Sequence, residues 1–345
     1  MQDIIFDLTE KFASLSREED MINTILSHLP KRYKNIIDKN GNLISTIEPK
    51  NHKKHILIDA HLDQIGLIVT KVFDDGFLKV APCGGIDARV LPGSLVKIFS
   101  DFGKIFNGII TSTPPHLSKG KDSDDFSKIA DLFVDTGLNF DKKSLELIKP
   151  GDFIGFANKP QKLLNGNISA PGLDNNAGVA VLICCAKILS ENIESLNSKV
   201  TFLFSTGEEI TGVGAKTSAF SVSPDIAITV ETSFADQKNV PDEKCGKLSN
   251  GSMIGISPIL SRKLSQDLIN IATIKKIPYQ LEVMSGKTGT NADDIVISKA
   301  GIPTALLSIP LRYMHTPVEV VNISDVENTV ELLSSYILTG ANDND

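Results

Sequence analysis

The sequence predicts an α/β protein whose mixed, mostly parallel sheet is flanked by helices and interrupted by a small inserted β-rich barrel domain. The stretch His55–Asp59 (HILID) is short and continuously apolar, as in strands that are buried on both faces of such a sheet. After Ala170 strand and helix patterns alternate, which is typical of an α/β domain. Between residues 67 and 165 closely spaced strand patterns replace the helices. We therefore expect residues 1–66 and 166–345 to form the α/β domain around an insert at 67–165.

The N-terminal segment predicts two helices and a hairpin. Apolar residues within 4–15 recur every three or four positions, as on one buried face of a helix. Ser16 and Glu19 form a capping box, which predicts that a second helix begins here and ends at Pro30. Asn40-Gly41 separates two short apolar segments and predicts the turn of a hairpin.

The rest of the chain shows two different patterns of predicted secondary structure. The insert is expected to hold strands at 77–80, 95–99 and 105–110, with an exposed polar loop at 119–125. Beyond it we expect helices at 175–190 and 261–276, strands at 199–205, 226–230 and 304–309, and a last helix capped by Ser324–Glu327.

Composition excludes several classes of protein. The chain has 345 residues, 41% of them hydrophobic, and 35 Lys and Arg against 42 Asp and Glu. The resulting net charge of −7 argues against nucleic acid as a partner, since phosphate neutralisation needs clustered basic residues. The apolar stretch Gly178–Ala186 is only half of the ~18 residues that a membrane span needs, and no signal peptide is recognised. Four scattered cysteines predict reduced thiols and a cytoplasmic location.

Five places in the sequence carry metal-ligand side chains near the ends of predicted strands, where ligand sites of α/β sheets gather. They are His61-Leu62-Asp63, Asp174, Glu208-Glu209, Glu231 and His315. In the first, both polar side chains leave an extended segment on the same side, so His61 could bind a metal while Asp63 orients a neighbour. Taken alone, Asp174 at the start of a helix is more simply explained as a helix cap. Of the two adjacent glutamates, one could bind a metal while the other moves a proton.

Together these places offer two histidines and three or four carboxylates. Such a set suits two divalent cations ~3.5–4 Å apart that share a bridging carboxylate and acidify a water between them. No cysteine occurs at these places, which disfavours a structural zinc site. Imidazole and carboxylate accept zinc, cobalt and manganese alike, so the metal stays open.

Several longer segments resemble one known family. AHLDQIG, SAPGLDNNAG, STGEEITGVGA and IPLRYMHTPVEV are similar to the cobalt- or zinc-activated aminopeptidases that form tetrahedral dodecamers, a family of glutamyl, leucyl and lysyl aminopeptidases often labelled endoglucanases. The resemblance covers nearly the whole chain and includes GGIDARVLPG in the insert. It implies a zinc-exopeptidase-like catalytic domain, a β-rich insert used in assembly, two divalent cations per subunit, a homo-oligomer, and short peptides with a free N-terminus as substrates.

Carried over by position, the resemblance also implies a role for each site residue. His61 and Glu231 would bind one cation, Glu209 and His315 the other, with Asp174 bridging them, Glu208 as the general base and Asp63 behind the ligands. Arg312 and Tyr313 precede His315 closely enough to shape the substrate pocket.

The chain departs from the family pattern at four positions that affect expectations of substrate preference and metal affinity. Gln64, Asn176, Glu231 and Asn291 stand where Glu, Arg, Asp and Asp are the commoner residues. Two other functions stay open: a different di-metal amidohydrolase, such as a deacylase or a carboxypeptidase, and a non-catalytic protein of the same fold. A carboxypeptidase would need a cationic group for the terminal carboxylate, and the retained Glu208 favours an active enzyme.

Overall fold

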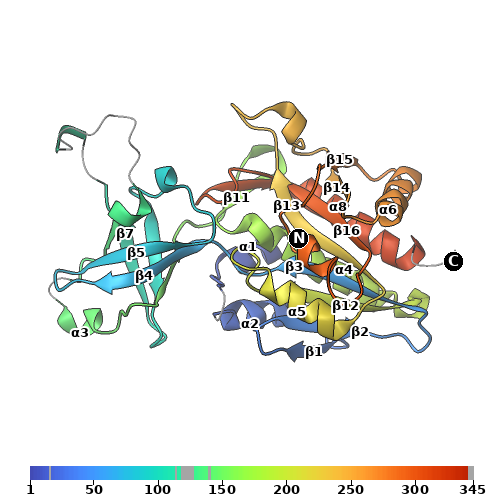
Figure 1. The fold of residues 1–345 in the computed structure, drawn as a ribbon, viewed down its shortest axis with the longest axis horizontal. Coiled ribbons are helices and arrows are strands. Elements are labelled where there is room, and N and C mark those ends of the chain that lie inside the picture. Colours follow the sequence, from blue (N-terminus) through green and yellow to red (C-terminus); the bar gives the residue numbers. More distant parts are fainter. Residues whose placement is uncertain (15–16, 113–114, 118–127, 139–140, 341–345) are drawn as a thin grey trace. The chain divides into compact units, whose positions relative to one another are not determined.

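The computed structural model describes residues 1–14, 17–112, 115–117, 128–138 and 141–340 (Figure 1). The chain divides into two compact units. Unit 1 comprises Met1–Asp63, Pro160–Met314 and Glu319–Asp345, and unit 2 comprises Gln64–Lys159 with the short segment His315–Val318.

Unit 1 is built on a mixed sheet of eleven strands within the described chain. Its order is β1-β2-β12-β3-β13-β16-β17-β11-β10, and β14 and β15 extend it beside β16 (Figure 1). The parallel pairs are β12–β3, β3–β13, β13–β16 and β14–β15, and the flanking pairs are antiparallel. The strands are β1 (Lys34–Ile37), β2 (Leu43–Ile47), β3 (Lys54–His61), β10 (Gln161–Lys162), β11 (Asn167–Ala170), β12 (Ser198–Ser205), β13 (Ile226–Phe234), β14 (Ser252–Ile256), β15 (Tyr279–Val283), β16 (Thr304–Arg312) and β17 (Glu319–Asn322).

Helices cover both faces of this sheet, as the sequence predicts. One face packs against α1 (Gln2–Thr9), α2 (Glu19–His28), α4 (Leu173–Glu191), α6 (Arg262–Lys275) and α8 (Ile323–Ser335), and the other against α5 (Val213–Val222) and α7 (Ala292–Ile295). On β3, Ile56 and Ile58 belong to the α4 side, whereas Leu57 belongs to the α5 side. Because side chains alternate along a strand, Asp59 and His61 face the same side as Leu57.

Helix α4 is the one described helix long and apolar enough to cross a membrane by length and composition. In the fold, 78% of its apolar window is buried. A core helix has the same composition and the same burial, so this helix is weak evidence for a membrane span.

The strands of unit 2 close into a barrel in the order β4-β5-β8-β7-β6-β9. They are β4 (Gly66–Val72), β5 (Phe77–Cys83), β6 (Leu95–Phe99), β7 (Ile105–Ile110), β8 (Phe133–Asp135) and β9 (Phe153–Phe156). The interior is filled by branched aliphatic side chains, among them Val80, Ile98 and Ile154. At Gly108 a Cβ would lie 2.5 Å from Val134 Cγ1, so only glycine fits there without a shift. The closed barrel confirms the predicted fold class of the insert.

The structure corrects the predicted elements at several points. Helix α1 ends at Thr9 rather than near residue 15, and the Thr9 hydroxyl donates to the Phe6 carbonyl, a local bond that competes with helix continuation. The last helix is capped by Asn322, whose Oδ1 accepts the Ser324 N–H at 2.9 Å, rather than by Ser324 and Glu327. Ser16 of the expected capping box and the polar loop at 119–125 lie outside the described residues.

Candidate metal centre

The centre of the candidate site is His61, the last residue of β3, which is 1% exposed. Its Nδ1 lies 3.0 Å from the Asp63 carbonyl oxygen, which can only accept a hydrogen bond. Nδ1 therefore carries the proton, and Nε2 is the ring atom available to bind a cation.

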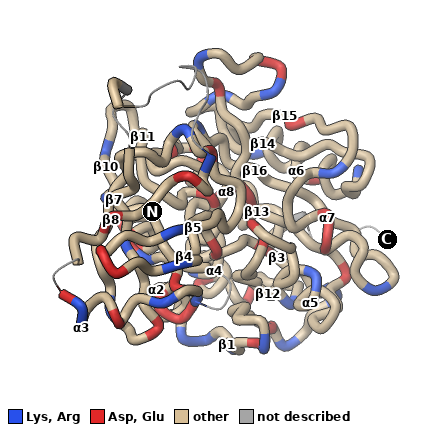
Figure 2. The backbone as a smooth tube through the Cα atoms, turned by 60° about the vertical axis from the view of Figure 1, so that its left-hand side comes forward, with Lys and Arg blue, Asp and Glu red and all other residues tan. Residues whose placement is uncertain are grey.

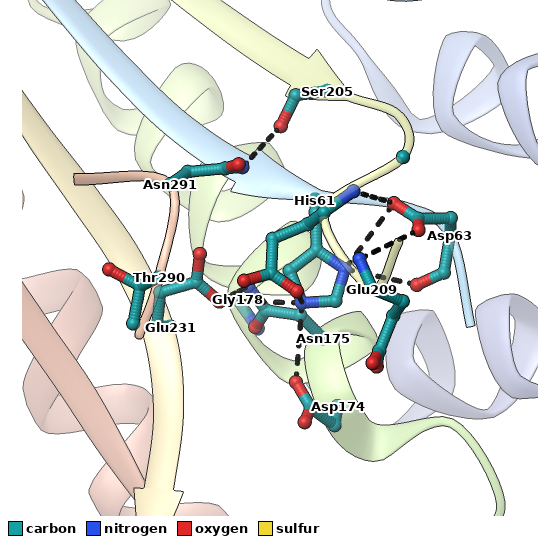
Figure 3. Close-up of polar contacts among 12 residues, drawn as sticks. His61, Asp63, Asp174, Asn175, Gly178, Ser205, Glu209, Glu231, Thr290 and Asn291 are labelled. Carbon is teal, nitrogen blue, oxygen red and sulfur yellow. Dashed lines mark hydrogen bonds and ion pairs between the residues drawn. The ribbon is translucent and has the colours of Figure 1, made fainter. Parts of the chain in front are cut away.

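Three carboxylate oxygens surround His61 Nε2 (Figure 3). Asp174 Oδ1 lies at 3.3 Å, Glu231 Oε2 at 3.4 Å and Glu208 Oε2 at 3.8 Å. Two atoms that bind one zinc ion tetrahedrally at ~2.0–2.1 Å lie roughly 3.3 Å from each other. Asp174 and Glu231 therefore have the spacing of ligands that share a cation with His61, and Glu208 stands farther away.

The side chains form two groups of possible metal ligands within unit 1. One is His61, Asp174 and Glu231, and the other is His61, Glu208 and Glu209; within each, the ligand atoms lie within 4.8 Å of one another. Ligand oxygens of Asp174 and Glu209 also lie within 4.8 Å of each other. Glu231 Oε1 is buried and has no hydrogen-bond partner in the described part of the chain. Because an unpaired buried carboxylate oxygen is costly, these residues fit a bound cation.

Burial and mutual repulsion shift the titration of these groups. Burial, together with the neighbouring carboxylates and against the opposing effect of His61, raises the pKa of Glu208 to about 7. Burial likewise raises the pKa of Glu231 well above its ordinary value. For His61 burial alone would lower the pKa, but the carboxylates, Glu231 foremost, raise it well above its ordinary value. Without a cation this cluster therefore holds extra protons.

Asp63 ties two parts of the site together. Its Oδ1 accepts the backbone N–H of Glu208 at 3.1 Å, and its Oδ2 accepts that of Glu209 at 3.2 Å (Figure 3). The two glutamates follow β12, which pairs in parallel with β3, so both strands deliver their last residues to the same edge of the sheet. The turn that carries the glutamates is thereby fixed to the strand that carries His61.

The start of α4 places Asp174 and supports Glu231. The Asp174 N–H donates to Glu319 Oε2 at 3.1 Å, and the peptide bond from Asp174 to Asn175 is cis. Asn175 Nδ2 donates to Glu231 Oε2 and to the Val230 carbonyl, both at 2.8 Å. Asp174 and Asn175 depart from helical dihedrals, so Asp174 is not a simple cap.

A buried polar network lies on β3 two residues before His61. Asp59 accepts from Ser205 Oγ at 2.6 Å and from Asn291 Nδ2 at 3.0 Å. Asn291 also donates to Ser205 (Figure 3). Sequence reasoning missed Asp59, Asn175 and Glu319 as parts of the site. The available signal was proximity along the chain, since each lies within four residues of a proposed ligand.

Two of the predicted positions differ in detail from the expectation. Glu231 does not end its strand, because β13 continues to Phe234. His315 begins the segment His315–Val318, which groups with unit 2, and its backbone has a φ of 62°. Its role as a ligand stays a prediction.

Arg312 and Tyr313 lie at the end of β16 and just beyond it. The Arg312 guanidinium forms an ion pair with Asp236 at 2.9 Å and also donates to the Asp236 carbonyl. Tyr313 has a φ of 59° and a side chain that is exposed. Their role in substrate binding stays a prediction.

Two cavities in unit 1 include residues of this region. One, of about 460 Å³, is lined by Glu208, Thr290 and Asn291 and extends to the acidic helix α7, which is red in Figure 2. The other, of about 270 Å³, is lined by Ser233 and Phe234 at the end of β13 and by residues of β14 and β15. The first cavity borders the proposed base Glu208, and the second lies beside the end of β13, beyond Glu231.

A buried histidine among carboxylates at the strand ends of an α/β sheet is compatible with several classes of metal-dependent hydrolase, aminopeptidases among them. Residues 41–332 match the sequence model of the M42 glutamyl aminopeptidase family, and the chain belongs to this family. This confirms the family resemblance predicted from the motifs, and it makes the chain a hydrolase that acts on peptide bonds.

Individual relatives agree over nearly the full length. A lysyl aminopeptidase of Pyrococcus furiosus is 30% identical over 320 residues, which are 92% of this chain and 90% of the relative. The structure of an aminopeptidase from Desulfurococcus kamchatkensis has a TM-score of 0.90 and 30% identity, covering 99% of this chain and 97% of that one. The TET1 peptidase of Pyrococcus horikoshii, described as assembling into a tetrahedron or a large octahedral shell, has a TM-score of 0.85 and 32% identity over 97% and 98% of the chains.

Proposed function

We propose that this chain is a di-metal aminopeptidase that removes N-terminal residues from short peptides using two divalent cations, zinc or cobalt, with manganese as a third candidate. The observation that carries the proposal is the spacing around His61 Nε2. Asp174 and Glu231 lie at 3.3 and 3.4 Å from it, the separation of atoms that share a cation.

The proposed ligand sets follow from this geometry and from the order of the motifs. His61 and Glu231 would hold one cation, Glu209 and His315 the second, and Asp174 would bridge them. The support for Asp174 is that its oxygens lie within reach of His61, Glu231 and Glu209.

The support for His315 comes from the chain on either side of it. β16 and β17 form an antiparallel hairpin in which Arg312 is paired with Val320, so the loop that contains His315 is short. Glu319 follows that loop and accepts the Asp174 N–H. Both ends of the loop are therefore attached to the part of unit 1 that carries the proposed bridging ligand.

Two cations held by these residues would supply Lewis acidity, which would polarise the scissile carbonyl and lower the pKa of bound water. Glu208 would act as the general base, because its carboxylate lies near His61 Nε2 but beyond the ligand spacing, at 3.8 Å. In this role Glu208 would take a proton from water and give it to the leaving amine. Asp63 would hold Glu208 in place through its backbone N–H.

Specificity for a free N-terminus is proposed to come from affinity of the substrate amine for a cation held by these residues. A carboxypeptidase would need a cationic side chain for the terminal carboxylate. The nearby Arg312 is held in an ion pair with Asp236, which favours the aminopeptidase.

The test is hydrolysis of aminoacyl-anilides and their N-acetylated counterparts after chelation and after return of Zn²⁺, Co²⁺ or Mn²⁺. Cleavage of the free-amine set alone, restored by metal, is the expected result. Cleavage of the acetylated set would indicate a deacylase or an endopeptidase. No cleavage with two cations bound would indicate a non-catalytic protein.

We also propose a homo-oligomer, with a dodecamer as the expected form, assembled through the barrel unit in the cytoplasm. Exposed apolar side chains on the barrel unit, Leu95, Phe102, Ile105 and Ile109, support an interface there. All four cysteines are free thiols, which agrees with a reducing compartment. Light scattering coupled to gel filtration tests the assembly, and a monomer at micromolar concentration would contradict it.

A further inference from the structure

A cavity of about 270 Å³ in unit 1 contains a carboxylate that the proposed mechanism does not use. The cavity is bounded by the apolar side chains of Phe234, Met253 and Met284, and by the polar side chains of Ser233, Thr288 and Glu282. Glu282, on β15, is partly buried, whereas the two other charged residues in the lining, Glu243 and Lys244, are exposed.

The carboxylate of Glu282 is held in one position by two hydroxyl groups. Ser308 Oγ donates to its Oε2 at 2.6 Å, and Ser233 Oγ donates to its Oε1. The two serines belong to neighbouring strands, β16 and β13, so their hydrogen bonds connect the carboxylate to the central part of the sheet. A carboxylate fixed by two donors presents its remaining lone pairs to the cavity in a defined direction.

The cavity lies on the same face of the sheet as the candidate metal centre. Glu231 and Ser308 are register partners on β13 and β16, so their side chains leave the sheet on the same side. Ser233 follows Glu231 by two residues, so it shares that face and lies about 6.6 Å farther along the strand. Glu282 is therefore adjacent to the metal centre on the side of Glu231.

The inference rests on the proposed aminopeptidase reaction, which determines which part of a bound peptide lies next to each cavity. Glu208 gives its proton to the leaving amine, so the leaving peptide lies on the side of Glu208, which lines the larger cavity. The side chain of the first residue then extends away from Glu208, toward the cavity beyond Glu231. From this arrangement we infer that Glu282 is the residue that selects the N-terminal side chain, and that it selects a cationic one, lysine or arginine.

The chemistry of the cavity fits such a side chain along its length. The aliphatic stem of lysine or arginine packs against the apolar lining of Phe234 and Met253 while its charged end reaches Glu282. The hydrogen bond between two charged groups in a partly buried cavity is stronger than one between neutral groups. An acidic side chain in the same place would face the carboxylate of Glu282 and be rejected.

The test compares kcat/KM for lysyl-, arginyl-, leucyl- and glutamyl-anilides in the metal-loaded wild type and in Glu282→Gln. We expect the wild type to prefer lysyl and arginyl substrates, and Glu282→Gln to lose about 10- to 100-fold on them, the range for a hydrogen bond to a charged group. The leucyl substrate should change less than about threefold, because a packing contact with no charge is kept. The glutamyl substrate should improve.

Glu243→Gln is the matched control, since it removes the exposed carboxylate of the same cavity and should leave the lysyl-to-leucyl ratio unchanged. An equal loss on all four substrates in Glu282→Gln would overturn the inference and show that Glu282 only joins β15 to the sheet. Cleavage of leucyl but not lysyl substrates by the wild type would overturn it while the aminopeptidase proposal stands.

A binding measurement separates the two proposals if no anilide is cleaved. Calorimetry of lysinamide and leucinamide on the wild type and Glu282→Gln should show tighter binding of lysinamide that the variant loses. Equal affinities in the wild type would overturn the selection of a cationic residue, whatever the outcome for catalysis.

Discussion

The carboxylate of Asp63 accepts the backbone N–H of Glu208 at 3.1 Å, so the residue two positions after the proposed ligand His61 fixes the proposed base. The other oxygen of Asp63 accepts the N–H of Glu209 at 3.2 Å, and its carbonyl oxygen accepts from His61 Nδ1 at 3.0 Å. One residue therefore sets the orientation of a proposed ligand, the position of the base and the position of a second ligand.

Asp63→Asn is expected to lower kcat by about 10- to 100-fold, the usual effect of removing a group that orients a metal ligand. An amide has only one acceptor oxygen, so its NH₂ group would face one of the two N–H donors. Steady-state kinetics with metal analysis on the same sample would measure the effect.

The matched control is Asp152→Asn in the barrel. Asp152 is also fully buried and also accepts two backbone N–H groups, from Lys149 at 2.8 Å and Asp101 at 3.0 Å. It should lower the melting temperature without changing kcat. If both variants kept the wild-type kcat, the positioning role of Asp63 would be wrong.

Glu208→Gln is expected to lower kcat by about 10²- to 10⁴-fold, the contribution of a general base, while the metal content stays unchanged. Glutamine keeps the backbone N–H that Asp63 accepts, so the turn should keep its position. Elemental analysis of the purified variant and its kcat are the two measurements. A variant with wild-type kcat would remove Glu208 from the role of base, and a variant without metal would make it a ligand.

His315→Ala is expected to lower metal occupancy, from two cations toward one per subunit, because the proposed second set would keep only Glu209 and the bridging Asp174. Two carboxylates bind a divalent cation less firmly than a set that includes an imidazole. Occupancy is measured after dialysis against a weak chelator. His28→Ala is the control, since His28 pairs with Asp7 at 3.0 Å far from the proposed ligands in sequence. Equal occupancy in both variants would exclude His315 from the site.

The sequence could point to the strand-end residues because a metal site needs specific types of side chain, and residue types can be read directly from a sequence; their role as ligands stays a prediction. His61, Asp174 and Glu231 come together in the structure as the order of strands implies. The support around them was not predictable, because Asn175 and Asp59 act through contacts that depend on how α4 and α7 pack. A single asparagine or aspartate gives no pattern for such contacts.

The fold shows the same limit. The parallel centre and the barrel could be predicted from apolar runs and turn residues, but β14 and β15 were missed. Strand β14 lies beside β16, and β15 pairs with β14 at the edge of the sheet (Figure 1). β15 is only partly buried on one face, so its alternation is weak. The end of α1 was misplaced because the Thr9 hydroxyl donates a hydrogen bond to a carbonyl of its own helix. The spacing of apolar residues in the sequence gives no information on such a bond.

Removal of the metal should make stability depend on pH in an unusual direction. In the metal-free protein the pKa values of Glu208, Glu231 and His61 are raised, that of Glu208 to about 7 from 4.5. The folded state then binds more protons than the unfolded state, so the stabilisation is fully present below the unfolded pKa values and is lost as pH rises. The melting temperature of chelated protein should therefore fall between pH 6.5 and 8.

The pH range begins at 6.5 because the titration of His55 below that pH would change the stability in the opposite direction. Burial lowers the pKa of His55 to about 4 from 6.5, so its contribution is lost as pH falls below 6.5 and is nearly constant above it. Metal-loaded protein is the control, because the cations replace the bound protons and the melting temperature should then not fall between pH 6.5 and 8. A melting temperature of chelated protein that rises from pH 6.5 to 8 would show that the cluster does not hold these protons.

Gly178→Ala should weaken both the fold and the metal site, although alanine favours helices over glycine by up to ~1 kcal/mol. A Cβ at this position would lie 2.3 Å from Asn175 Oδ1 and 2.8 Å from the Val230 carbonyl (Figure 3). Overpacking of this kind costs about 1–3 kcal/mol, which outweighs the gain in helix propensity. It would also displace the side chain that donates to Glu231 Oε2. Denaturant unfolding and metal titration are the two measurements. Gly286→Ala is the control, because a Cβ there would contact no heavy atom within 4 Å. Equal results for the two variants would contradict the role of Asn175 in supporting Glu231.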